Sequence, residues 1–219
     1  MQTVPLPRED MSNVETVDLL NVLRHLLLKS PDRGLLEAVA TTLRRVLCET
    51  RGDSTESARA LLDEVETLLA AGDEALTAAQ VDYTRLFFGP GAPAVPPYAS
   101  LYQGQGRMLM QEGAAEARKA YRDLGFVLED RSVQPDHAGV EIELLMATLA
   151  RSMKREALEP DLVLRVRAFL DAHAMRWLPV FFDRLAQRAS TTLYRRTAEL
   201  GSMVLAQTSG VLARSGGAE

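Results

Sequence analysis

The residue types best able to do chemistry gather at Pro135-Asp136-His137, with Glu141 four residues further on. On a helix, His137 and Glu141 share a face, so that with Asp136 they could be a metal site. The spacing supplies no recognised further ligand, and no metal or cofactor is predicted. A plainer interpretation is that Asp136 caps the helix that follows it. Another is that Asp136 and His137 offer hydrogen-bonding groups to a partner at the mouth of a groove.

A proline-rich loop between two aromatic clusters, over residues 83–102, is the second notable feature. Gly89 and Pro90 end an apolar helix, and three further prolines favour an extended path with few backbone donors. Large side chains bracket the loop in a chain that is only 5% aromatic, which predicts an apolar surface able to receive a peptide. The residues expected to form this surface are Tyr83, Leu86, Phe87, Pro97, Tyr98 and Tyr102. For Leu86 and Phe87, a place in the core is the open alternative.

A third group, His173, Trp177 and Pro179, follows an apolar stretch. His173 and Trp177 are one helical turn apart. The plainest interpretation is an aromatic core in which the imidazole and indole nitrogens are satisfied internally.

The elements that position these residues are helical almost throughout. Apolar residues recur with a period of 3.6 and capping signals precede several runs, at Ser12 with Glu15 and at Thr77 with Gln80. We expect an all-α, compact bundle of about ten helices. Residues 1–124 are predicted to form an N-terminal helical lobe, residues 125–137 a hinge loop and residues 138–219 a C-terminal helical lobe, or the two lobes form one globular domain. Later helices are expected over 138–155, 161–174 and 191–212, with a kink or restart at Pro179.

The composition of the chain disfavours several classes of protein, among them nucleic-acid-binding, membrane-spanning and disulfide-linked proteins. The chain has 219 residues and is 47% hydrophobic, which suffices for a substantial core. Its net charge of −5 disfavours general nucleic-acid binding. No apolar run is long enough for a membrane span and no secretory leader is recognised, so a cytoplasmic location is expected. The single cysteine, Cys48, excludes an intramolecular disulfide and is expected to be buried on a helix.

Three motifs in order resemble the TorD/DmsD group of redox-enzyme maturation chaperones. The first is carried by Tyr83, Leu86, Phe87, Gly89, Pro90, Pro96, Pro97, Tyr98, Ser100 and Tyr102. The second is Pro135-Asp136-His137 followed by Glu141, Leu144, Leu145 and Met146, and the third is Phe169, Leu170, His173, Trp177, Pro179 and Phe181. The chain departs from the family pattern at Val133 and Gln134, where an acid is frequent, and at Gly91, where some members have a tryptophan.

The resemblance implies a non-enzymatic cytoplasmic chaperone without a cofactor. Its partners would be the apo-form of a molybdopterin-containing oxidoreductase and its twin-arginine signal peptide, with molybdenum-cofactor biosynthesis proteins as further partners. The implied binding residues are the loop residues named above together with Pro135, Asp136, His137 and Glu141; Gly89, Pro90, Ser100, His173, Trp177 and Pro179 are implied as fold markers. A NarJ-like chaperone for a membrane-bound, non-exported reductase is the first alternative. A helical metal-dependent hydrolase is the alternative from another class.

Overall fold

The computed structural model describes residues 13–50, 55–103, 112–126, 133–153, 164 and 168–215. In order these form α1 (Asn13–Leu28), α2 (Arg33–Glu49), α3 (Glu56–Ala71), α4 (Asp73–Phe87), α5 (Ser100–Gln103), α6 (Glu112–Asp123), α7 (Ala138–Met153), the π-helical turn η2 (Leu170–Ala174), α9 (Met175–Arg188) and α10 (Thr192–Ser215). Within these ranges β-bridge pairing is limited to one isolated bridge, between Tyr98 and His137. The predicted all-α class is confirmed. The described helices include none with the length and apolarity to span a bilayer.

Local signals explain where α2 and α4 begin. Asp32 precedes α2, and its carboxylate accepts a hydrogen bond from the Leu35 amide at 2.7 Å, which satisfies one of the free donors at the helix start. Gly72, at φ +87, makes the tight turn from α3 directly into α4. The capping box expected at Thr77 is therefore wrong, because the helix has already begun at Asp73 and the Thr77 hydroxyl donates to the Asp73 carbonyl at 2.8 Å. The capping residue expected for α1, Ser12, lies outside the described residues.

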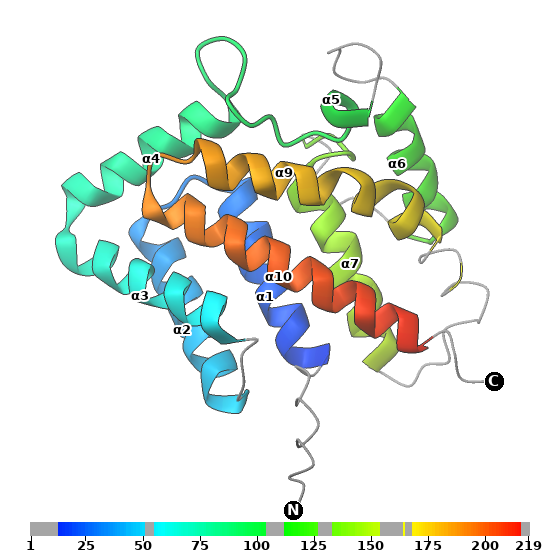
Figure 1. Cartoon of the computed structure of the whole chain (residues 1–219), viewed down its shortest axis with the longest axis horizontal. Helices are drawn as coiled ribbons and strands as arrows, with labels where there is room; N and C mark the ends of the chain where they lie inside the picture. The colour runs from blue at the N-terminus through cyan, green and yellow to red at the C-terminus, as the bar shows by residue number, and fades with distance from the viewer. Residues whose placement is uncertain are drawn as a thin grey trace, which may run out of the picture.

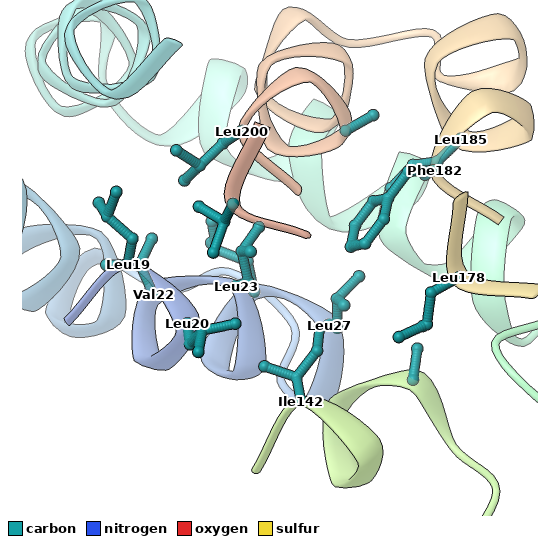
Figure 2. Packing of buried hydrophobic residues seen from close by; sticks show 14 of the residues in the cluster. Leu19, Leu20, Val22, Leu23, Leu27, Ile142, Leu178, Phe182, Leu185 and Leu200 are labelled. Atoms are coloured by element: carbon teal, nitrogen blue, oxygen red, sulfur yellow. The ribbon is translucent and has the colours of Figure 1, made fainter. Parts of the chain in front are cut away.

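The core runs through elements from both halves of the chain. Figure 1 shows α9 and α10 crossing the molecule side by side, with α1 and α7 behind them. Helix α1 packs against α2, α7 and α10, and its leucines Leu19, Leu20, Leu23, Leu26 and Leu27 are almost wholly buried. In Figure 2, Leu27 lies next to Ile142 of α7 and points toward Phe182 of α9. One continuous hydrophobic cluster therefore joins the two predicted lobes, and their separation by a hinge stays a prediction.

Two glycines allow helices to approach each other closely. A Cβ on Gly201 of α10 would lie 2.3 Å from the Phe182 ring, and one on Gly139 of α7 would lie 2.6 Å from Leu28 of α1. Real Cβ atoms do not come this near to other carbons, so a side chain at either position would force the helices apart or displace their neighbours.

The helix around Pro179 begins in an unusual way. Pro179 lies inside α9 and has no N–H to donate to the carbonyl of Met175, four residues earlier. The wide turn η2 ends immediately before Met175, so the break expected near Pro179 takes the form of a π turn on the N-terminal side of the proline.

The prediction that Cys48 is buried is wrong. Cys48 is exposed on α2, because the buried stripe of that helix runs through Leu36, Val39, Ala40, Leu43 and Val46 and leaves position 48 on the outer face.

Candidate functional site

The proline-rich loop turns back onto the helix that it follows. The amide of Val95 donates to the Leu86 carbonyl at 2.8 Å, and that of Ala94 donates to the Arg85 carbonyl at 3.2 Å. These bonds satisfy carbonyls at the end of α4 that the helix itself leaves free. Gly89 and Gly91 permit the reversal, with φ of +51 and +128. The extended path predicted for the loop is therefore replaced at its start by a compact turn.

Beyond this turn, residues 97–100 run antiparallel to residues 135–138, and we call these two segments the loop junction. The amide of Ala99 donates to the Asp136 carbonyl at 2.9 Å, and the amide of Ala138 donates to the Pro97 carbonyl at 2.8 Å. Two of the three sequence motifs are thus brought together by backbone hydrogen bonds.

The buried side chain of Asp136 links the two segments of the loop junction. Its carboxylate accepts a hydrogen bond from the Ser100 amide at 3.1 Å, at the start of α5, and the residue is only 1% exposed. The interpretation that Asp136 caps the helix after it is therefore wrong, since its carboxylate caps the short helix of the other segment. In this conformation the carboxylate is also withdrawn from any arginine of a bound peptide.

His137 takes the capping place at the start of α7. Its Nδ1 accepts a hydrogen bond from the Gly139 amide at 3.0 Å, so Nδ1 carries no proton and the neutral ring is protonated at Nε2. Burial lowers the pKa of His137 from 6.5 to about 4, which keeps the imidazole neutral near pH 7. The ring of Tyr98 meets it edge to face, with centroids 5.2 Å apart.

Glu141 lies beneath the junction and is fully buried. One carboxylate oxygen is 2.8 Å from His173 Nε2, and the other accepts from Trp177 Nε1 at 2.9 Å. Burial raises the pKa of Glu141, and the hydrogen bonds from His173 and Trp177 oppose that rise. The expectation of internal partners is confirmed for the indole nitrogen of Trp177 and for Nε2 of the His173 imidazole. The predicted role of Glu141 as an acid presented to a partner does not fit this arrangement, because both of its oxygens are engaged.

The aromatic residues of the loop motif divide into a buried and an accessible set. Tyr83, Leu86 and Phe87 are 5%, 0% and 2% exposed. The core interpretation of Leu86 and Phe87 is therefore confirmed. None of the three side chains is accessible enough to form part of a peptide-binding surface. Pro97 and Pro135 are also buried, and the Pro135 carbonyl accepts from the Tyr121 hydroxyl at 2.9 Å. The accessible aromatic side chains are Phe88, which is 55% exposed, and the half-buried Tyr98 and Tyr102.

Sequence reasoning missed Asp82, which joins α4 to the corner between α9 and α10. One oxygen accepts from the Arg85 guanidinium at 2.7 Å, and the other accepts from the amides of Ser190 and Thr191 at 3.0 and 2.8 Å. Burial opposes the charged form, but these hydrogen bonds outweigh it and lower the pKa of Asp82. A signal was present, because Asp82 occupies a core-facing position next to Tyr83 in an otherwise apolar stripe.

The described side chains contain no group of three or more His, Cys, Asp or Glu residues placed to hold a metal ion. Asp136 and Glu141 direct their carboxylates at different protein donors, so the metal-site interpretation gains no support from the geometry.

The site is therefore a junction of three motifs that are joined by hydrogen bonds, with accessible aromatic side chains on its outer surface, in an all-α protein. Residues 51–183 match the family described as nitrate reductase delta subunit. The chain belongs to this family.

Comparisons with individual proteins agree with this assignment. The chaperone protein TorD of Vibrio parahaemolyticus is 28% identical over 143 residues, which cover 64% of this chain and 66% of TorD. The Tat proofreading chaperone DmsD of Salmonella typhi is 29% identical over 126 residues, 57% of each chain. The chain thus spans about three fifths of the length of these curated relatives. The resemblance to the TorD/DmsD group is confirmed.

A solved structure from Archaeoglobus fulgidus, described as a redox enzyme maturation protein, shares the fold. Its TM-score is 0.54 at 20% identity, and the match covers 94% of this chain and 99% of that one.

Proposed function

We propose that this protein is a cytoplasmic maturation chaperone that binds the apo-form of a molybdopterin-containing oxidoreductase through its twin-arginine signal peptide. The observation that carries the proposal is the loop junction, where motifs shared with the TorD/DmsD group meet in space in a chain whose curated relatives are named chaperones. Binding would delay export until the cofactor is inserted. No catalytic step is needed.

The accessible aromatic side chains support a peptide-binding role for the outer surface. Phe88, Tyr98 and Tyr102 present apolar area beside a backbone that is fixed by hydrogen bonds, and rigid aromatic surfaces bind apolar peptide segments at low entropic cost. Asp136, His137 and Glu141 would act by holding this surface in shape, because each is almost wholly buried.

The proposal is tested by titrating the protein with three forms of the apo-reductase. The first bears its leader, the second lacks the leader, and the third bears a leader whose arginine pair is changed to lysines. We expect the first to bind most tightly. Phe88→Ala should weaken leader binding, while Val81→Ala should not, because Val81 is an apolar residue of the preceding helix α4 that is 63% exposed. Equal affinity for all three enzyme forms would reject recognition of the leader.

A chaperone for a membrane-bound, non-exported reductase is the second candidate. The observation favouring it is the family description, which names a subunit of nitrate reductase. Binding of a reductase that carries no twin-arginine leader at least as tightly as a leader-bearing enzyme would decide for this candidate.

A further inference from the structure

The outer face of α9 carries an exposed stripe of four residues, Arg176, Val180, Arg184 and Arg188, which we call the basic stripe. All four are exposed, and Val180 is 42% accessible. Residues four apart lie along one ridge of a helix. The stripe therefore extends for about 18 Å, given a rise of about 1.5 Å per residue.

Within the described residues no ion pair joins an arginine of the basic stripe to a carboxylate, whereas five other arginines there are paired in this way. Ion pairs elsewhere join Arg24 to Glu143, Arg44 to Glu66, Arg45 to Asp18, Arg85 to Asp82 and Arg196 to Glu199. Asp183, the acid on α9 itself, accepts a hydrogen bond from Gln187 at 2.8 Å. With three arginines and one aspartate, α9 has a formal charge of +2 in a chain whose net charge is −5.

The basic stripe contacts α5, which directly follows the loop junction, through Arg184. Its guanidinium carbon lies 4.8 Å from the centre of the Tyr102 ring, a cation–π arrangement. Tyr102 in turn packs on Trp177, with ring centroids 5.4 Å apart. Arg184 is thus held against a fixed ring, so it loses less side-chain freedom on binding than a free arginine would. Figure 1 shows the chain from α4 to α5 passing along α9.

We propose that the basic stripe docks an acidic segment of the client polypeptide, with carboxylates on the arginines and an apolar side chain on Val180. This proposal rests on the proposed function for the identity of the partner. It places a second contact beside the leader site, because a leader with two arginines is repelled by a surface of like charge. Charge complementarity selects an acidic occupant, and the acidic balance of the whole chain disfavours nucleic acid as that occupant.

The first test uses a 16-residue peptide with glutamates at every fourth position and leucines between them, and a second peptide with glutamines in place of the glutamates. Fluorescence anisotropy should show binding of the acidic peptide that weakens as salt rises. The double variant Arg184→Gln/Arg188→Gln should weaken it roughly five- to tenfold, since exposed charge pairs are individually weak. Arg59→Gln is the matched control, because Arg59 is exposed on α3, away from the basic stripe, and should leave the affinity within about twofold.

The proposal is overturned if the double variant binds the acidic peptide as tightly as Arg59→Gln does, or if the glutamine peptide binds equally well. Tighter binding of a DNA duplex than of the acidic peptide would overturn it in favour of nucleic acid. Leaderless apo-reductase should be retained by the wild type and lost by the double variant. If the wild type fails to bind any leader, the proposed function is rejected independently of the basic stripe.

Discussion

Glu141 on α7 and Trp177 on α9 are joined by a hydrogen bond of 2.9 Å between the carboxylate and the indole, although they are 36 residues apart in the chain. The second oxygen of the same carboxylate faces His173 Nε2 at 2.8 Å. Two sequence motifs thus form one polar cluster inside an apolar core. Such a cluster fixes the packing of two helices only while every member is satisfied.

Removing the carboxylate should therefore be costly. Glu141→Ala leaves the donors of Trp177 and His173 buried without their acceptor, and we expect the free energy of unfolding to fall by about 3–5 kcal/mol. Trp177 is the single tryptophan, so urea unfolding followed by its fluorescence measures the change. Glu143→Ala is the control on the same helix. Glu143 pairs with Arg24, and both side chains are partly exposed, Glu143 at 42% and Arg24 at 26%. The free energy of unfolding should therefore fall by less than about 1 kcal/mol in this variant. Similar losses in the two variants would contradict the structural role of the cluster.

The sequence was sufficient to predict the helical class and the burial of the apolar stripes, because both follow from a local period of 3.6. It predicted that His173 and Trp177 are satisfied internally, yet could not name Glu141 as their partner, since that contact depends on how α7 meets α9. Asp136 illustrates the same limit. Its cap signal was recognised, but the helix that it caps lies in another segment, which only the tertiary structure brings near.

Burial of His137 should make stability depend on pH. The unfolded chain binds a proton on this ring below pH 6.5, whereas the folded chain does so only below about 4. The contribution is therefore complete above pH 6.5 and is lost as pH falls from 6.5 towards 4, by about 3 kcal/mol. We expect the decline in this window to be smaller in His137→Gln, measured by urea unfolding at a series of pH values. His25→Gln should alter it less, because that ring is only half-buried. Identical slopes in wild type and His137→Gln would refute the assignment.

Asp82 should be needed for the corner between α9 and α10. Asp82→Ala removes the acceptor for the Ser190 and Thr191 amides and for Arg85, and we expect a loss of about 3 kcal/mol, since hydrogen bonds to a charged group are the stronger kind. Because its folded pKa is lowered, the contribution of Asp82 is present above pH 3.8 and is lost as the pH falls further. Asp183→Ala, at an exposed position of α9, should cost less than about 0.5 kcal/mol. Thermal unfolding of both variants at pH 7 makes the comparison, and equal melting temperatures would exclude the predicted role.

The close approach of α9 and α10 predicts that Gly201 cannot be replaced cheaply. Gly201→Ala places a methyl group 2.3 Å from the Phe182 ring, and overpacking of this kind costs about 1–3 kcal/mol. Gly34→Ala in α2 is the control, because its Cβ would meet nothing nearer than 3.5 Å, and alanine there should be neutral or stabilise by up to about 1 kcal/mol. The double variant Gly201→Ala/Phe182→Leu should be less destabilised than the sum of the single changes. Strict additivity would show that the ring is not the obstacle.

Asp136 distinguishes support of the loop junction from direct contact with a client. Its carboxylate accepts from the Ser100 amide and is 1% exposed. The side-chain oxygen of asparagine can accept the same bond, so Asp136→Asn should keep stability within about 0.5 kcal/mol and Asp136→Ala should lose about 1–2 kcal/mol. If the residue acts by shaping the surface, affinity for the leader should follow stability, with Asn close to wild type and Ala weaker. Calorimetric titration with the leader peptide, at temperatures where each variant is fully folded, measures this order. A loss of about tenfold or more in Asp136→Asn at full stability would mean that the carboxylate leaves Ser100 and binds an arginine of the leader, since a charge-assisted hydrogen bond is worth about 1.5–3 kcal/mol.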